Sequence, residues 1–356
     1  MKKKILISYN FILHYREDFF ELLNEFYDVT VLHSGQPPAN TEHSYSIIHT
    51  NVMKLGPFYL QQGLFNTYYK NQFDAVILLF DLRWLNVVAF LFFKRILRLK
   101  CKVITWGSWK TNKRILDAIR YWLMCRVDAN IFYCDAAKSA FLKLGLPEHK
   151  AFVANNTFKV EIDVPCYLNS EKDSLLFVGS LDERKRNSTL LSAFAASIPH
   201  IPEKIRLVFI GDGHERLFLE GEAKRLGIIN RVQFLGRINN PKELVKYYNK
   251  AICTVSYGQA GLSVLQSMGF GVPFMTLKNA VSGGEITNIK NEHNGVLLDA
   301  GLDALKRQLI RICNDEDWAR SLGRNAYQYY QKNCKLEHMV QGFVEAIENK
   351  GFLASE

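Results

Sequence analysis

Short runs of apolar, mostly β-branched residues recur along the chain, and longer segments between them repeat apolar residues every three or four positions. The short runs predict buried strands and the longer segments predict amphipathic helices. Their alternation is typical of parallel α/β sheets. Strands are predicted in the first half at residues 4–8, 28–32, 75–79, 102–105 and 129–132, with helices at 17–26, 85–97, 114–125 and 136–144.

The stretch 158–173 lacks helical period, mixes charges and contains Pro165, so we place a linker between two domains there. A second series follows, with strands predicted at 174–178, 205–210, 231–235, 251–255 and 272–275. From Leu302 to about residue 350 the pattern is helical, with breaks near Asp315 and Lys335. We therefore expect two Rossmann-like domains at 1–165 and 166–334, with a helix at about 335–356 that packs back on the first.

Length and composition agree with this division. A chain of 356 residues with 48% hydrophobic and 22% charged residues is long enough for two cores. The N-terminus lacks a signal peptide pattern, so we expect the mature protein to begin at Met1. Residues 84–97 are too short and too charged to span a bilayer. Seven scattered cysteines without a Cys-x-x-Cys pair are expected to be reduced, mostly buried thiols.

Three glycine turns follow the first, second and fourth predicted strands of the second domain. They are Gly179-Ser180-Leu181, Gly211-Asp212-Gly213 and Gly258-Gln259-Ala260-Gly261-Leu262. Glycine turns at strand ends expose backbone N–H groups that suit phosphate, although each turn alone is ordinary in an α/β protein. Arg184, Lys185 and Arg186 beside the first turn are either a diphosphate-binding cluster or a solvated charge run, and we favour the cluster because the helix dipole disfavours cations there.

The order of these motifs resembles family 4 of the GT-B glycosyltransferases. The resemblance is carried by the three turns, the segments 232–236 and 269–273, and Gly284-Glu285-Ile286, and it covers about half the chain. It implies an α/β GT-B fold in which two Rossmann-like domains face each other across a cleft. It also implies a metal-independent, retaining hexosyltransferase without a cofactor, which uses a nucleotide-diphosphate sugar as co-substrate.

By this resemblance the second domain binds the donor. Lys185 matches the family lysine that contacts the donor phosphates, with Arg184 as a second catalytic cation. The turn around Gly261 and Leu262 matches the segment that holds the distal phosphate and sugar. Gly236 and Arg237 match the loop near the nucleobase. The donor-binding set is completed by Gly179, Ser180, Gly211, Asp212, Gly213, Gly258, Gln259, Ala260, Gln266, Gly284 and Glu285.

Two positions depart from the family pattern. Many members carry two glutamates eight positions apart around the third turn, and Gly258 and Gln266 occupy those places here. Gln266 retains the ability to bond ribose hydroxyls, but Gly258 has no side chain to contact the sugar. Ser180 stands where arginine is common, and Arg184 or Arg186 would compensate. The donor sugar and nucleobase stay open.

Four residues of the first domain are acceptor-side candidates at the expected cleft: His14, Arg16, Trp106 and Ser108. Ser108 stands where a histidine often follows the glycine in one family branch. For His14, a polar loop role is as good an interpretation as acceptor recognition, and Trp106 is equally explained by packing. Asn155-Asn156-Thr157 is interpreted as a structural motif at the domain edge.

The formal charge of +10 favours acidic partners without naming one. Aromatic residues at 84, 90, 92 and 93 lie beside several lysines and arginines, which fits contact with an anionic membrane, but burial against the sheet is favoured for the aromatics. We expect a cytoplasmic protein, peripheral to the inner membrane face, that acts on a glycan or lipid-linked acceptor. No recognition motif supports nucleic-acid binding.

The resemblance suggests transfer to an acceptor in surface polysaccharide or glycolipid biosynthesis. Two rivals remain: a GT-B sugar-nucleotide epimerase, which needs no acceptor, and a non-catalytic nucleotide-sugar-binding scaffold. Turnover without acceptor would identify the epimerase, and binding without turnover would identify the scaffold. We expect no metal site.

Overall fold

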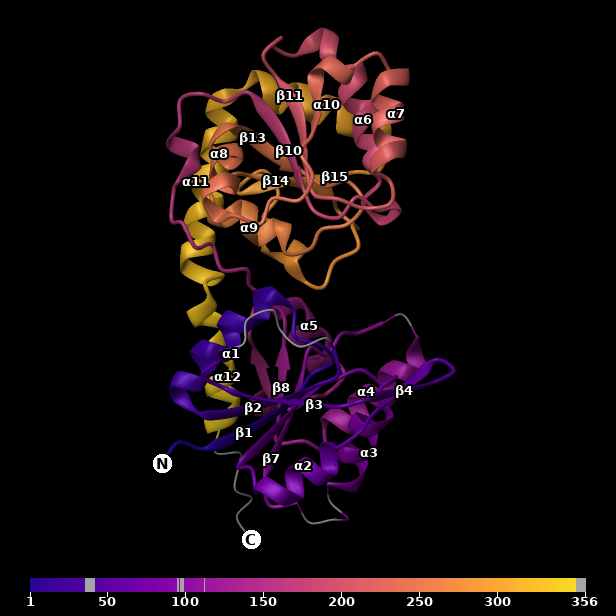
Figure 1. The fold of residues 1–356 in the computed structure, drawn as a ribbon, viewed down its shortest axis with the longest axis vertical. Helices are drawn as coiled ribbons and strands as arrows, with labels where there is room; N and C mark the ends of the chain where they lie inside the picture. Colours follow the sequence, from indigo (N-terminus) through magenta and orange to yellow (C-terminus); the bar gives the residue numbers. More distant parts are fainter. Residues whose placement is uncertain (36–41, 95, 97–98, 112, 350–356) are drawn as a thin grey trace. The chain divides into compact units, whose positions relative to one another are not determined.

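The structure is a computed structural model that describes residues 1–356 apart from 36–41, 95, 97–98, 112 and 350–356. The side chain of His14 also lies outside the described part. The chain forms two compact units. The N-terminal unit comprises Met1–Asn156 and Leu336–Glu356, and the C-terminal unit comprises Thr157–Lys335. Figure 1 shows both units with their helices and strands labelled.

The N-terminal unit is built on a seven-stranded sheet in the order β3-β2-β1-β6-β7-β8-β9, in which every pair is parallel. Alternate side chains enter opposite layers: Ile5 and Ile7 face one cluster and Leu6 the other. The strands are β1 (Lys4–Ser8), β2 (Asp28–His33), β3 (Ser46–His49), β6 (Ala75–Leu79), β7 (Lys102–Trp106), β8 (Ala129–Phe132) and β9 (Ala151–Val153).

Helices cover both faces of this sheet. One layer holds α1 (His14–Phe26) and the C-terminal helix α12 (Leu336–Glu348), which lie side by side in Figure 1. The other layer holds α2 (Leu64–Asn71), α3 (Leu85–Phe93), α4 (Arg114–Met124) and α5 (Asp135–Leu142). The last helix of the chain therefore completes the core of the first unit.

An antiparallel hairpin, β4 (Val52–Leu55) and β5 (Phe58–Gln61), was not predicted from the sequence. It joins α3 through a Tyr59–Trp84 ring stack at 5.3 Å. The edge strand β3 was missed as well, because a run of four partly exposed residues lacks a clear apolar pattern. The strand β9 lies where the apolar residues before Asn155 indicate the end of a strand at the domain edge.

The C-terminal unit holds a parallel six-stranded sheet in the order β12-β11-β10-β13-β14-β15. Its strands are β10 (Ser174–Val178), β11 (Arg206–Ile210), β12 (Val232–Phe234), β13 (Ala251–Val255), β14 (Phe274–Leu277) and β15 (Gly295–Leu298). Four of the five strands predicted here match within one residue at each end. The fifth, predicted at 272–275, is displaced by two residues because Val272 and Pro273 precede β14. The edge strand β15 was not predicted.

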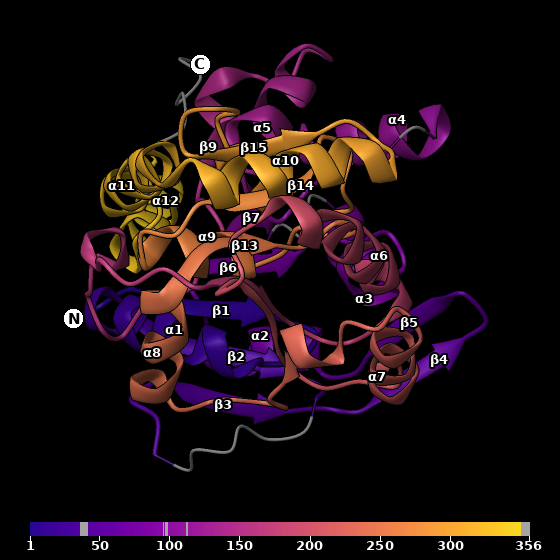
Figure 2. The same ribbon diagram turned by 90° about the horizontal axis from the view of Figure 1, so that it is seen from above.

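Six helices cover this sheet among the described residues. One face carries α6 (Asn187–Ser197), α7 (Arg216–Arg225) and α10 (Leu302–Asn314), with α6 between the other two in Figure 2. The other face carries α8 (Pro241–Lys250), α9 (Ser263–Gly269) and α11 (Glu316–Asn333). The helix breaks predicted near Asp315 and Lys335 lie where α10 and α11 end.

The chain passes from the first unit to the second after Asn156, nine residues before the predicted boundary at 165. The predicted linker belongs to the C-terminal unit, because Val160, Ile162 and Val164 pack against the core beneath α8. The chain returns to the first unit after Lys335.

All seven cysteines are free thiols, six of them buried and Cys125 partly buried. In the part of the chain that the structure describes, no helix combines the length and apolarity that crossing a membrane requires.

Candidate functional site

The glycine turns of the C-terminal unit lie around the point where its strand order reverses. The sheet runs from β10 outward to β11 and β12 on one side, and to β13, β14 and β15 on the other. The turns after β10 and β13 therefore flank this switch point. In open parallel sheets, ligands bind outside the carboxyl ends of the strands at such a position.

Backbone hydrogen bonds join the first turn to the loops after β11 and β12. The N–H of Gly179 donates to the carbonyl of Ile210 at 3.0 Å, and the N–H of Leu181 donates to that of Asp212 at 3.0 Å. The N–H of Gly211 donates to Gly236 at 2.8 Å. Three loops that are distant in sequence thus form one continuous backbone surface at the carboxyl edge.

Two glycines are required by the close approach of these loops. A Cβ on Gly211 would lie 1.8 Å from the carbonyl oxygen of Gly179, and one on Gly213 would lie 2.3 Å from that of Leu181. Gly211 also has a φ of 139°, which disfavours other residues. The exposed Asp212 uses its carboxylate to accept from the N–H of Gly213 at 2.9 Å.

Through Gly258, the third turn contacts the short segment that follows the first turn. The N–H of Gly258 donates to the carbonyl of Lys185 at 3.0 Å, and an added Cβ would lie 2.1 Å from the carbonyl oxygen of Arg184. A glutamate therefore does not fit at position 258 in this backbone arrangement. The packing around Gly258 therefore excludes the glutamate that the family pattern has at this position.

The rest of the third turn is held by the segment after β14. Ala260 is buried, and its N–H donates to Val281 at 2.9 Å. The hydroxyl of Ser256 donates to the carbonyl of Gln259 at 2.7 Å. Gly261 has open space where a Cβ would be, and Leu262 caps the start of α9. The segment 258–262 is thus fixed at one end and open at Gly261.

The buried Glu285 lies in the loop that follows this segment. Its carboxylate accepts from the N–H of Gly283 at 2.9 Å and from the hydroxyl of Ser282 at 3.0 Å. Gly284, with a φ of 121°, precedes Glu285 and admits the turn. Glu285 and Lys185 interact electrostatically, so this loop faces the first turn.

Lys185 is the central cation of the site. It ends the short helix η3 (Glu183–Lys185), only 7% of it is exposed, and its Cε passes 3.7 Å from where a Cβ on Gly179 would lie. Burial lowers the pKa of its ammonium. No described residue makes an ion pair or hydrogen bond with that ammonium, and a buried cation without a partner is suited to receive an anion.

Arg184 and Ser180 are engaged by Asp182, which sequence reasoning missed. The Asp182 carboxylate accepts from Arg184 Nη2 at 2.8 Å and from Ser180 Oγ at 2.7 Å, and it caps η3. The Arg184 bond is the main cause that lowers the pKa of Asp182 to about 2. The Arg184 side chain is 69% exposed, and its charge is paired with Asp182 at the protein surface. Asp two residues before Arg at a helix start is a capping signal that could have revealed this contact.

Gln266 lies on α9 and is 8% exposed. Its side-chain oxygen accepts from the hydroxyl of Tyr248 at 3.2 Å, and Tyr248 stacks on Phe270 at 4.4 Å. The predicted ribose contact would therefore use the amide nitrogen. In the loop predicted to lie near the nucleobase, Gly236 has a φ of 75° and Arg237 is exposed.

The predicted acceptor-side residues mostly lie inside the N-terminal unit. Arg16 and Trp106 are buried with the guanidinium 5.4 Å from the indole ring, and Trp106 also stacks on Tyr9 at 5.1 Å. Arg16 bonds the Asn156 side chain. Ser108 is 1% exposed and its hydroxyl has no partner among the described residues. His14 begins α1, and its side chain lies outside the described residues. Packing accounts for Trp106.

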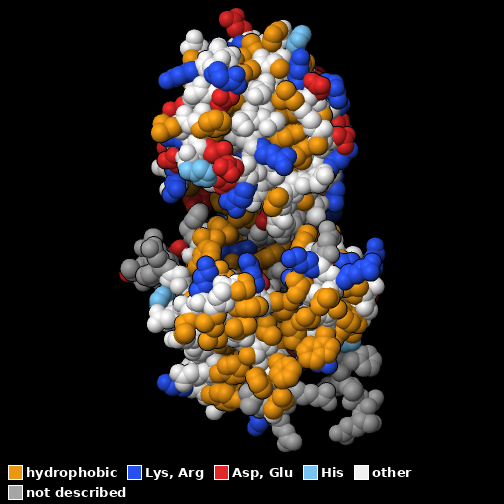
Figure 3. All heavy atoms as spheres, turned by 90° about the vertical axis from the view of Figure 1, so that its right-hand side faces the viewer, with side chains coloured by type: hydrophobic (Ala, Val, Ile, Leu, Met, Phe, Trp, Pro, Cys, Tyr) orange, Lys and Arg blue, Asp and Glu red, His pale blue; other side chains and the backbone are white. Residues whose placement is uncertain are grey.

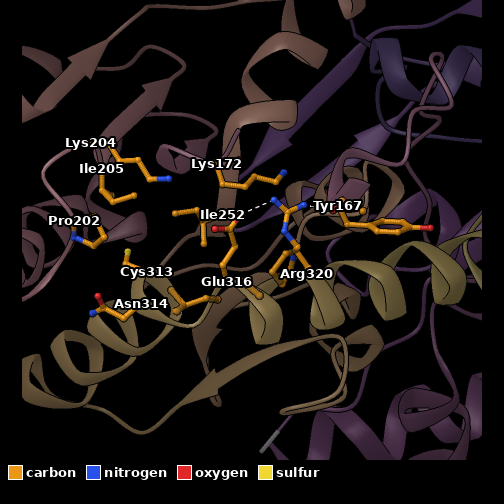
Figure 4. Close-up of a pocket in the computed structure, with 15 residues that line it drawn as sticks. Tyr167, Lys172, Pro202, Lys204, Ile205, Ile252, Cys313, Asn314, Glu316 and Arg320 are labelled. Carbon is orange, nitrogen blue, oxygen red and sulfur yellow. Dashed lines mark hydrogen bonds and ion pairs between the residues drawn. The ribbon is translucent and has the colours of Figure 1, made fainter. Parts of the chain in front are cut away.

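A cavity of about 180 Å³ in the C-terminal unit lies at the opposite edge of the sheet (Figure 4). It adjoins Ile205 and Ala251, where β11 and β13 begin. The buried Lys172 beside it donates to the carbonyls of Cys166 at 2.8 Å and Asn249 at 2.9 Å. Arg320 donates to Tyr167 at 2.8 Å. These cations brace the segment that enters the sheet, and they are separate from the donor-site turns.

Across the described residues, no three histidine, cysteine, aspartate or glutamate side chains gather as metal ligands would. The Lys185 ammonium and the backbone N–H groups of the turns lie at the carboxyl edge, and groups of this kind suit phosphate.

The whole described fold matches solved GT-B structures. HepE of Anabaena in complex with UDP aligns with a TM-score of 0.71 and 15% identity, over 97% of this chain and 99% of that one. A glycosyltransferase from Rickettsia africae aligns with a TM-score of 0.73 and 12% identity, over 98% of each chain. The protein therefore has the GT-B fold, as predicted.

Residues 162–329, within the C-terminal unit, match the family Glycosyl transferases group 1. The resemblance predicted from the sequence is thus confirmed for this segment of the chain. The match contains the three glycine turns, Lys185 and Glu285.

Curated relatives match a similar stretch. A GalNAc-α-(1→4)-GalNAc-α-(1→3)-diNAcBac-PP-undecaprenol α-1,4-N-acetyl-D-galactosaminyltransferase of Campylobacter jejuni is 32% identical over 196 residues, 51% of this chain and 52% of the relative. The N-acetyl-α-D-glucosaminyl L-malate synthase of Bacillus anthracis is 26% identical over 177 residues, 49% of this chain and 45% of the relative. The chain thus spans about half the length of the relatives it matches.

Proposed function

We propose that the protein is a retaining glycosyltransferase that moves a sugar from a nucleotide diphosphate to a glycan or lipid-linked acceptor in surface polysaccharide or glycolipid biosynthesis. The observation that carries this proposal is the Lys185 ammonium. It is buried at the switch point of the C-terminal sheet, beside two glycine turns, and no described residue makes an ion pair or hydrogen bond with it. A donor diphosphate would supply these bonds.

In the proposed complex, the diphosphate lies against the turns that begin at Gly179 and Gly258, and Lys185 contacts its oxygens. The open space at Gly261 receives the distal phosphate and the sugar. Because Gly258 lacks a side chain, the sugar is recognised at this point by backbone groups. The amide nitrogen of Gln266 bonds the ribose, and the loop at Gly236 and Arg237 borders the base.

In the proposed reaction, the bond between the anomeric carbon and the diphosphate oxygen breaks, and its electron pair leaves on the diphosphate. The acceptor oxygen forms its bond on the same face of the sugar, so the anomeric configuration is retained. The acceptor proton passes to a phosphate oxygen of the departing group. Lys185 stabilises the charge that develops there, and this step uses no metal.

The acceptor class follows the relatives. The Campylobacter relative acts, by its name, on an undecaprenol-linked glycan, which favours a lipid-linked acceptor for this chain. We also propose that the N-terminal unit recognises the acceptor, with the loop that leads into His14 as its first candidate. A cytoplasmic protein in peripheral contact with the membrane would meet such an acceptor.

The experiment is a turnover assay with UDP-, GDP- and ADP-sugars, with and without lipid-linked oligosaccharides. We expect one donor to release nucleotide faster when acceptor is present and to give a product with the donor's anomeric configuration by NMR. Donor interconversion without acceptor would instead identify an epimerase. Binding without turnover would identify a scaffold, and an inverted product would contradict the retaining mechanism.

A further inference from the structure

The N-terminal unit carries a face on which large apolar side chains point outward. It is formed by the end of α3, the segment before α4, and α4 itself, and we call it the apolar face. Its six members are between 41% and 76% exposed: Phe92, Phe93, Trp109, Ile115, Ile119 and Trp122. This corrects the expectation that the aromatics after residue 84 are buried, because Trp84 and Phe90 are buried but Phe92 and Phe93 are not.

Five of these side chains, all except Trp109, adjoin one another. Ile115, Ile119 and Trp122 are four and three positions apart on α4, which places them on one side of the helix. Trp122 stacks on Phe92 of α3 with ring centroids 6.3 Å apart, and Phe92 contacts Phe93. The two helices therefore present one surface.

The polarity of α4 is the reverse of that of an ordinary surface helix. Its one acidic residue, Asp117, is 5% exposed and accepts from Arg120 at 2.9 Å and from the N–H of Thr111 at 2.9 Å. The outward side holds apolar residues, with Arg114 exposed at the start of the helix. Singly exposed apolar residues are common, but a continuous patch of this kind marks an interaction surface.

Positive charge surrounds the apolar face. Residues 43–127 contain thirteen lysines and arginines and three aspartates, a net charge of 13 − 3 = +10. The remaining residues of the N-terminal unit contain eight basic and thirteen acidic residues, a net charge of 8 − 13 = −5. The positive charge of this unit is therefore concentrated in the segment that builds the face.

Figure 3 views the side on which α3, α4 and the β4–β5 hairpin lie in Figure 1, and hydrophobic side chains cover much of the N-terminal unit there. Lysine and arginine side chains border them. The hairpin adds exposed Met53, Leu55 and Phe58.

Not every nearby cation belongs to this surface. Lys94 pairs with Asp128, and Lys102 donates to the carbonyl of Ile347 at 2.7 Å. Arg95 and Arg98 lie outside the described residues. Lys110, Lys113 and Arg114 are exposed beside the apolar face. Lys110 and Arg114 also line an open hollow of about 530 Å³ whose other walls include Ala118, Tyr121 and Leu144.

We propose that the apolar face docks on an anionic lipid bilayer. Aromatic and aliphatic side chains enter the interfacial region, and Lys110, Lys113 and Arg114 contact headgroup phosphates, with the hollow accepting one headgroup. A second copy of the chain is a poorer occupant because two faces of the same positive charge would repel each other. The inference goes beyond the proposed transfer, because docking requires neither donor nor acceptor.

The test is co-sedimentation of the full chain with phosphatidylcholine vesicles, with and without phosphatidylglycerol. We expect binding to the anionic vesicles that weakens as salt is added, because the attraction between exposed charges is screened. Ile119→Ser with Trp122→Ser should reduce the partition constant by about 10- to 100-fold. Leu217→Ser with Phe218→Ser is the matched control, since these α7 side chains are 81% and 54% exposed in the other unit.

A charge pair separates electrostatic from apolar binding. Lys113→Glu with Arg114→Glu should abolish the preference for anionic vesicles, whereas Lys242→Glu with Lys246→Glu on exposed positions of α8 should preserve it. No binding by the wild type, equal binding to neutral vesicles, or equal loss in either control would overturn the proposal. So would a dimer in sedimentation velocity that Trp122→Ser dissociates. Nucleotide binding by the same preparations reports separately on the proposed function.

Discussion

At the residue scale, the proposed donor site depends on where backbone atoms leave no room for a side chain. Gly258 and Gly261 are three positions apart in one turn, yet a Cβ on Gly258 would meet the carbonyl of Arg184 at 2.1 Å and one on Gly261 would meet nothing within 4 Å. The sequence alone presents both as glycines of a phosphate-binding turn. Only the contact of Gly258 with the backbone at Arg184 distinguishes them, and this contact leaves no room for a glutamate side chain.

This difference predicts that an alanine is poorly tolerated at position 258 and well tolerated at position 261. Gly258→Ala should push the third turn away from Lys185 and cost about 1–3 kcal/mol of unfolding free energy, as overpacking does. Gly261→Ala should change it by less than about 0.5 kcal/mol. Chemical denaturation of both variants measures the two values. Equal unfolding free energies for the two variants would show that Gly258 does not lie against the backbone of Arg184.

Lys172 predicts a pH dependence of stability. Burial lowers its pKa to about 8. Between about pH 8 and the ordinary lysine pKa of about 10.4, the unfolded chain binds a proton that the folded protein does not. Lys172 therefore makes the free energy of unfolding increase as pH rises through this range. Below about pH 8 both states are charged and its contribution is constant.

Lys172→Met removes this titration while keeping much of the side-chain volume. The unfolding free energy of the wild type, relative to that of Lys172→Met, should therefore increase between about pH 7.5 and about pH 10. Denaturant titrations of both proteins at several pH values measure the difference. A difference that stays constant over this range would show that the Lys172 ammonium is not buried as described.

At the element scale, the sequence predicted the buried strands well. Strands β1, β6, β8, β10 and β13 have the predicted bounds because each is a short apolar run buried between two helical layers. The β4–β5 hairpin escaped prediction because its exposed Met53, Leu55 and Phe58 break the alternation that marks a half-buried strand. The motif residues of the site were predicted by resemblance, whereas the pairing of Arg184 with Asp182 and the burial of Arg16 depend on tertiary contacts.

The same substitution in two helices tests the packing of α12. Alanine favours a helix over glycine by about 1 kcal/mol. At Gly221 in α7 an added Cβ meets nothing within 4 Å, so Gly221→Ala should stabilise the protein. At Gly342 in α12 it would lie 2.3 Å from the carbonyl of Val153, so Gly342→Ala should destabilise it. Thermal unfolding that shifts in the same direction for both variants would contradict the docking of α12 on β9.

At the scale of the whole molecule, the donor is proposed to bind the C-terminal unit. Hydrogen exchange with saturating nucleotide and no acceptor should show protection in 179–187, 209–216 and 256–266, since ligand binding stabilises the segments it contacts. The β4–β5 hairpin and α4 should exchange as in the free protein. Protection confined to the N-terminal unit would place the nucleotide elsewhere.

The central claim is that Lys185 holds the donor diphosphate, and calorimetric titration with UDP, GDP and ADP tests it most directly. The wild type should bind one nucleotide selectively. Lys185→Ala should bind it about 10- to 150-fold more weakly, the value of a hydrogen bond to a charged group. Lys224→Ala, which removes an exposed lysine of the same unit, should bind it unchanged. Equal affinities for the wild type and Lys185→Ala, or no binding of any nucleotide, would contradict the account.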